Sequence, residues 1–202
     1  MSRTPPAPTP TACIAFAATG LPDQSGLRQA FGVPLQVLQA HALSEVRGVV
    51  EAAEAASLAG RWCVGFLAYE AAAAFDAALQ THAPQPGLPL AWFAVYAEPA
   101  PAESFDPGQP DAVRADWAPG PPRDTFDADL AALHTAIADG EVYQVNHTAL
   151  LHGTLQAGRP WDLFAALRRE QPAGFGAWID GGAWQVLSAS PELFFDWNRH
   201  QL

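Results

Sequence analysis

The chain has 202 residues, of which 50% are hydrophobic and 15% are charged. This balance supports a packed core and excludes an intrinsically disordered chain. The ten basic residues are all arginine and stand against 21 acidic residues, which gives a formal net charge of −11. Nucleic acid is therefore excluded as a partner, because binding to it requires basic groups that neutralise phosphates.

Several features that the sequence lacks exclude further classes of protein. Lysine does not occur, so the chain offers no side-chain amine for a Schiff base or a covalent adduct. No stretch approaches the ~18 consecutive apolar residues of a membrane span, and the first ten residues do not resemble a signal peptide. Cys13 and Cys63 are too few for a disulfide scaffold and are typical of buried thiols in a reducing compartment. We expect a cytoplasmic protein with no membrane partner.

The first half of the chain predicts an α/β region over residues 12–98, after a flexible N-terminus at residues 1–11. Apolar runs predict strands at residues 13–17, 34–40, 62–69 and 89–97, and the third run is apolar enough to be buried on both faces. Ser44 is a candidate N-cap for a helix that ends at Gly60, where a C′ glycine belongs. Residues 71–79 have a helical composition.

A change of composition then separates this region from the second half. Residues 99–123 are rich in Pro, Ala, Gly and Asp, so they predict a linker without regular secondary structure.

Residues 124–202 predict a second region that begins with a helix. Asp124 or Thr125 is the expected N-cap, Gly140 the expected end, and one face of the helix carries four apolar residues, Phe126, Leu130, Leu133 and Ile137. Further along we expect a strand at 142–151, a helix from Pro160, a hairpin of strands 175–179 and 183–188 around a turn at 180–182, and a strand at 193–197. Because the last hairpin lacks a second strand, we expect the sequence to end within a domain.

Three stretches carry side chains suited to chemistry. The first, residues 65–70, is an apolar strand that ends in Tyr69 and Glu70. Glu70 is either an acid/base group or a charge at a helix start, and we favour the helix start.

The second stretch, residues 139–148, places Tyr143, Gln144 and Asn146 at a junction between a helix and a strand. These side chains either brace neighbouring loops or contact a ligand directly.

His147 lies in the same stretch and can titrate near neutral pH. With no Cys, His or carboxylate pair close to it in the sequence, it does not predict a metal site.

The third stretch, residues 188–194, places Glu192 directly after Pro191 and between apolar segments. Proline restricts the backbone, so Glu192 is expected to be held at a strand edge, and burial there would raise its pKa toward that of a general acid. A purely structural role for Glu192 is the alternative. Ser188 and Ser190 lack the glycine-flanked turn and the paired base of serine hydrolases, so the sequence does not indicate that class of enzyme.

In this order, residues 64–72, 137–146 and 188–194 resemble signature stretches of the chorismate-utilising enzymes, most closely the aminodeoxychorismate synthase component I branch. The resemblance covers about residues 12–202. It implies an α+β fold of the anthranilate synthase component I type, an antiparallel β-sandwich with helices outside, here truncated. It also implies that ammonia from a glutamine amidotransferase partner replaces the 4-hydroxyl of chorismate, which supplies p-aminobenzoate and folate synthesis. Glu192 matches the catalytic carboxylate of the family.

The same resemblance also implies that this chain lacks several functional groups of the family. The family's lysine and its Mg²⁺-binding glutamates correspond to positions beyond Leu202, so no metal ligand is assigned here and the chain alone is predicted to be inactive. The stretch that forms a tryptophan pocket in relatives reads QPAGF at residues 171–175, so bound tryptophan is not implied. Two alternatives stay open: a fragment of an anthranilate synthase component I, and a noncatalytic module that binds a ligand or docks a partner.

Overall fold

The computed structural model describes residues 7–17 and 26–196. The chain divides into two compact units, one made of Met1–Asp111 together with Pro160–Leu202 and the other of Ala112–Arg159. We call them unit 1 and unit 2. Their bounds differ from the predicted division at residues 98 and 124, because the segment after Pro160 packs with the first half of the chain.

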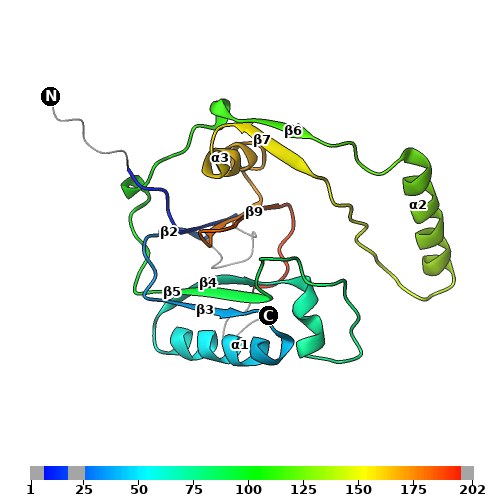
Figure 1. The fold of residues 1–202 in the computed structure, drawn as a ribbon, viewed down its shortest axis with the longest axis horizontal. Helices are drawn as coiled ribbons and strands as arrows, with labels where there is room; N and C mark the ends of the chain where they lie inside the picture. The colour runs from blue at the N-terminus through cyan, green and yellow to red at the C-terminus, as the bar shows by residue number, and fades with distance from the viewer. Residues whose placement is uncertain (1–6, 18–25, 197–202) are drawn as a thin grey trace. The chain divides into compact units, whose positions relative to one another are not determined.

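Unit 1 contains two antiparallel sheets (Figure 1). The first has the strand order β2-β1-β8-β9. Its strands are β1 (Ala12–Phe16), β2 (Arg28–Phe31), β8 (Phe175–Asp180) and β9 (Gln185–Ser190). The second sheet has the order β3-β5-β4 and consists of β3 (Gln36–Ala40), β4 (Trp62–Leu67) and β5 (Ala91–Tyr96).

The two sheets of unit 1 pack face to face through alternate residues of their strands. Trp92, Ala94 and Tyr96 of β5 share a buried cluster with Phe31 and Ile179 of the first sheet. Successive side chains of a strand point to opposite faces, which is why every second residue of β5 joins this cluster. The ring of Trp184, which follows β8, lies edge-on to Trp92 at 5.4 Å between centroids.

Helices cover the outer faces of these sheets. Helix α1 (Leu43–Leu58) buries Val46 in a cluster with Ala40 and Ala91 of the second sheet. Helix α3 (Pro160–Glu170) buries Trp161 and Phe164 against Trp178 of the first sheet. Unit 1 is thus an antiparallel sandwich with a helix on each side. The predicted α+β class is confirmed, and the specific likeness to anthranilate synthase component I stays a prediction.

Unit 2 consists of β6 (Arg114–Trp117), α2 (Arg123–Ala138) and β7 (Gly153–Ala157). Strands β6 and β7 pair antiparallel, with Trp117 opposite Gly153 and a register shift between Arg114 and Ala115. The prediction that the linker at residues 99–123 has no regular secondary structure is therefore wrong. This stretch contains β6 and two short 3-10 helices, η2 (Ala102–Ser104) and η3 (Pro110–Ala112).

Several predicted element bounds need correction. The predicted strand at 142–151 does not form, and residues 153–157 take its place opposite β6. Residues 193–196 form no strand, and residue 197 lies outside the described residues. Residues 71–79 give only the 3-10 helix η1 (Tyr69–Ala74). Strand β4 buries only Val64, because it is an edge strand of its sheet rather than a central one.

The helix starts also differ from the prediction, while the ends agree. Helix α1 is capped at Ala42, not Ser44, and the Glu45 carboxylate accepts hydrogen bonds from the backbone N–H groups of His41 and Ala42 at 2.9 and 3.0 Å. Pro122 precedes α2, which places the predicted caps Asp124 and Thr125 inside its first turn. Gly60 and Gly140 adopt φ of 81° and 77°, as expected of glycines that follow helices.

Candidate functional site

The first motif lies where β4 ends and η1 begins, in unit 1. Gly65 pairs with Phe93 of β5, and a Cβ at this position would lie 2.1 Å from the carbonyl oxygen of Trp92. Only glycine fits such a close approach of two backbones. Glu70 lies in the first turn of η1, as the helix-start interpretation predicts.

Arg47 of α1 holds the far end of η1, a role that the sequence did not reveal. Its Nε and Nη2 atoms donate hydrogen bonds to the carbonyl oxygens of Ala74 and Phe75, both at 2.8 Å. Its guanidinium carbon also lies 5.3 Å from the centroid of the Phe75 ring, within the range of a cation–π contact. No local sequence pattern predicts these contacts, because Arg47 precedes its partners by 27 and 28 residues and meets them only in the folded chain.

The third motif follows β9, also in unit 1. The Ser190 hydroxyl donates to the backbone carbonyl of Glu192 at 2.7 Å and accepts from its N–H at 3.2 Å. These two bonds fix the backbone of Glu192 in a bend directly after the strand. The predicted burial of Glu192 between two apolar strands is wrong: the residue is exposed, because no strand follows it at 193–196. The role assigned to its carboxylate stays a prediction.

The second motif belongs to unit 2, where it continues from the C-terminus of α2. Tyr143, Gln144 and Asn146 are all exposed, and Tyr143 reaches a relative exposure of 95%. A carboxylate does lie next to His147, although the sequence gave no sign of it: His147 Nε2 is 3.2 Å from Oδ2 of Asp129 in α2. Asp129 is a single carboxylate, so this contact does not contradict the expectation that His147 lacks a carboxylate pair.

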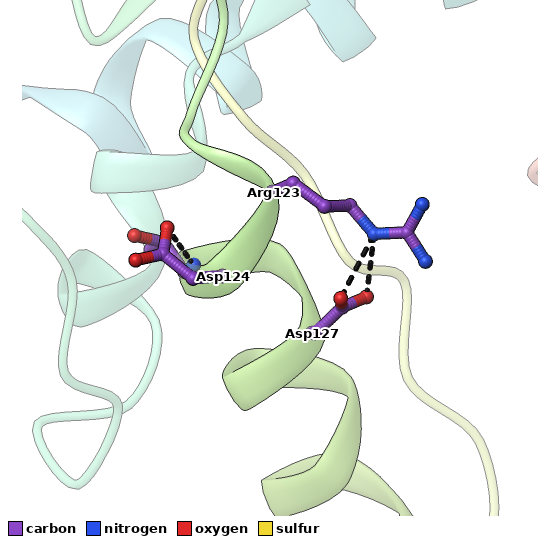
Figure 2. A network of polar contacts seen from close by, with 4 residues as sticks. Arg123, Asp124 and Asp127 are labelled. Atoms are coloured by element: carbon purple, nitrogen blue, oxygen red, sulfur yellow. Dashed lines mark hydrogen bonds and ion pairs between the residues drawn. The ribbon is translucent and has the colours of Figure 1, made fainter.

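The first turn of α2 carries its own polar contacts (Figure 2). Arg123 Nε lies 2.8 and 2.9 Å from the two carboxylate oxygens of Asp127, one helical turn away. Asp124 accepts a hydrogen bond from the backbone N–H of Thr125 at 2.9 Å. Because these side chains are exposed, the contacts stabilise the helix start only weakly and do not form a binding site.

Cavities lined by described residues open on unit 1, and two of them do not suit an anionic ligand. One of about 260 Å³ lies between β1, β2 and β4, and its polar side chains are those of Gln29 and Cys63. The other, of about 340 Å³, is lined by the end of β4, by η1 and by residues 79–81, with Tyr69, Gln80 and Thr81 as polar groups. Neither lining includes an arginine, so neither cavity offers a counter-charge for a carboxylate.

Burial governs the titration of the cysteines and of one tyrosine. Desolvation raises the pKa of the Cys13 and Cys63 thiols, and the positive charge of Arg168 opposes this effect at Cys13. Burial also raises the pKa of Tyr96, against a hydrogen bond between its hydroxyl and that of Thr11 that lowers it. The cysteines are thus protonated at neutral pH. Both are only partly buried, so the prediction of two buried core thiols is wrong: Cys13 packs against the cluster of Trp161, Phe164 and Trp178, whereas Cys63 lines the cavity of about 260 Å³.

Comparison with known proteins identifies the family. The sequence model of the chorismate binding enzyme family matches residues 24–202, which is most of the chain. The chain belongs to the chorismate binding enzymes. It is 44% identical over 64 residues to a Streptomyces griseus protein named aminodeoxychorismate synthase, a match that covers 32% of this chain and 9% of that protein. It is 27% identical over 93 residues to aminodeoxychorismate synthase component 1 of Escherichia coli (strain K12), covering 46% of this chain and 20% of the relative.

The chain therefore matches only a small part of the length of these two relatives. No solved structure matches it. Within the described residues, no helix is long and apolar enough to cross a membrane.

Proposed function

We propose that the protein to which this chain belongs aminates chorismate to 4-amino-4-deoxychorismate, and thereby supplies p-aminobenzoate and folate synthesis. The observation that carries the proposal is the 44% identity over 64 residues to a protein named aminodeoxychorismate synthase. The resemblance of residues 64–72, 137–146 and 188–194 to signature stretches of that branch supports it. In the proposed reaction, ammonia forms a C–N bond as the 4-hydroxyl departs, and the hydroxyl leaves as water.

Glu192 is the proposed acid/base group of this reaction. Its carboxylate is exposed and forms no ion pair with any described residue, so it is open to a ligand. Ser190 fixes the backbone that carries it. In its acid form the carboxyl group can donate a proton to the departing hydroxyl, and the carboxylate that results can take one from the incoming ammonia. Tyr143, Gln144 and Asn146 are the proposed lining residues, because exposed phenol and amide groups can donate and accept hydrogen bonds.

Magnesium is proposed for the complete enzyme, but the residues described here do not fit a site for it. A Mg²⁺ site needs converging oxygen ligands, usually with at least one or two carboxylates. Among the described residues, no three His, Cys, Asp or Glu side chains come together in a way that could hold a metal ion. We therefore derive no step of the reaction through the ion and assign no ligand to it.

A glutamine amidotransferase subunit is the proposed source of ammonia. The Escherichia coli relative is named as component 1 of its synthase, a name that supports a second component. Ammonium salt replaces such a partner in an assay, since free ammonia is the attacking species in the proposed reaction.

The experiment compares the 202-residue chain with a longer protein, made by extending the chain with the segments that its relatives carry beyond the matched part. Both are incubated with chorismate, Mg²⁺ and an ammonium salt at mildly alkaline pH, and products are separated and identified by mass. We expect the longer protein to form 4-amino-4-deoxychorismate and the chain alone to be far slower, because the chain has no lysine and its described residues form no carboxylate cluster for the metal. Failure of the longer protein to aminate chorismate would overturn the proposal. Rapid turnover by the chain alone would show that the reaction needs neither a lysine nor a carboxylate cluster for the metal.

A further inference from the structure

Residues 141–152, which we call the return segment, follow α2 and lead back to β7. One side-chain contact joins the middle of this segment to α2. His147 Nε2 lies 3.2 Å from Asp129 Oδ2, and the His147 ring meets the Phe126 ring edge-on at 5.5 Å between centroids. Phe126 and Asp129 are three residues apart in the helix and therefore neighbours on its surface. A single imidazole thus contacts both.

The chain reaches this position without strain. The helix rises about 15 Å over the ten residues between Asp129 and Asp139 at ~1.5 Å per residue. Gly140 then turns the chain with a φ of 77°. The seven residues from Gly140 to His147 can span up to about 23 Å when extended. The segment is therefore long enough to run back along α2 and place His147 beside Asp129.

Little else holds the middle of the return segment. Its two ends are held by backbone hydrogen bonds, from Glu141 N–H to the carbonyl of Ala136 and from Ala118 N–H to the carbonyl of His152. Between these ends, the contact of His147 with Asp129 is the one hydrogen bond that the segment makes within the described part of the chain. The side chains of His147 and Asp129 are 27% and 51% exposed.

We propose that His147 and Asp129 form a pH-dependent latch that fixes the return segment on α2 and so positions Tyr143, Gln144 and Asn146. When the imidazole is protonated, as acid favours, the contact is an ion pair. When the ring is neutral, only a hydrogen bond and the ring contact with Phe126 remain. The latch is therefore tighter at pH 6 than at pH 8. It concerns the placement of this segment and does not depend on the proposed reaction.

The other ionisable groups of the two elements do not contact the imidazole in the described structure. In the first turns of α2, Asp127 pairs with Arg123, and Asp124 accepts from the Thr125 N–H (Figure 2). The remaining groups on α2, at its end and on the segment are exposed: His134, Asp139, Glu141, Tyr143 and His152. Asp129 is thus the group that makes the contact depend on the protonation of His147.

Amide hydrogen exchange on the whole chain tests the latch at pH 6 and pH 8, with rates corrected for intrinsic exchange. Removal of a partly exposed ion pair by Asp129→Asn should raise exchange in residues 142–150 by about 1.5- to 5-fold at pH 6. It should also remove the difference in protection between the two pH values. His152→Gln is the matched control, because it removes an exposed imidazole from the same segment, and it should leave both quantities unchanged.

A second measurement tests the latch even if the amides of residues 142–150 exchange too fast to be followed. In ¹H NMR, the His147 ring protons should show a nuclear Overhauser effect to the Phe126 ring in the wild-type chain at pH 6. Protection of α1 serves as the internal reference that the variants are folded. Unchanged segment protection and pH dependence in Asp129→Asn would overturn the latch. So would the absence of the ring-to-ring effect in the wild-type chain.

Discussion

Substitution of Gly65 by alanine tests the backbone approach on which the first motif depends. The added Cβ would lie 2.1 Å from the carbonyl oxygen of Trp92 and 2.8 Å from the Cα of Phe93. Both atoms belong to the backbone of β5, so neither can move aside as a side chain would. Overpacking in a well-packed interior costs roughly 1–3 kcal/mol. Because here the strands themselves must separate, we expect about 3 kcal/mol of lost stability.

Urea unfolding followed by circular dichroism measures this loss. With an m-value of about 2 kcal/mol/M, the midpoint should fall by roughly 1.5 M. Gly48→Ala is the matched control, since Gly48 lies inside α1, is exposed, and has no atom within 4 Å of the Cβ position. Alanine there should stabilise the chain by about 0.5–1 kcal/mol. A Gly65→Ala midpoint equal to or above that of the wild type would refute the close approach of β4 and β5.

Three further predictions concern burial and catalysis. Trp178→Phe removes the hydrogen bond from Nε1 to the buried carbonyl of Pro10, 2.8 Å long in the structure, and should lower the free energy of unfolding by about 1–3 kcal/mol in urea titrations. Because burial raises the pKa of Cys13, its alkylation by iodoacetamide should be slower than that of a free thiol at pH 8 and should accelerate as the pH rises; a rate equal to that of free cysteine would contradict the assigned burial. In the longer protein, Glu192→Gln should lower kcat by roughly 10²–10⁴ with KM within a few fold, whereas Glu70→Gln should change kcat little; steady-state kinetics would disprove the assignment if Glu70→Gln were the more damaging change.

The strands of unit 1 were predictable where the sequence carries a run of apolar residues. Strands β4, β5 and the β8–β9 hairpin were found this way, and the turn between β8 and β9 was marked by its Asp-Gly-Gly sequence. Strand β2 (Arg28–Phe31) was missed, because its sequence RQAF has no apolar run and its strand form comes from pairing with β1. Strand β6 was missed for the same reason, since its partner β7 begins 36 residues after Trp117.

The motifs were visible in the sequence, but their surroundings were not. The prediction of a strand at 142–151 rested on apolar residues such as Val142 and Leu150, yet both are exposed and no strand pairs with them in the described structure. The buried position assigned to Glu192 failed because it assumed a following strand. The contact between His147 and Asp129 joins residues 18 positions apart, on two elements that local sequence patterns do not link. Each of these features depends on contacts between residues far apart in the sequence, and local sequence patterns do not predict such contacts.

The proposed chorismate amination is tested most directly by the fate of the nitrogen atom. The longer protein that contains this chain is incubated with chorismate, Mg²⁺ and ¹⁵N-labelled ammonium, and the product is examined by ¹⁵N NMR and mass spectrometry. We predict that ¹⁵N is bonded to the ring carbon that carried the 4-hydroxyl of chorismate. Attachment of ¹⁵N to a different ring carbon would identify the anthranilate type of reaction and contradict the proposal, as would a product without ¹⁵N.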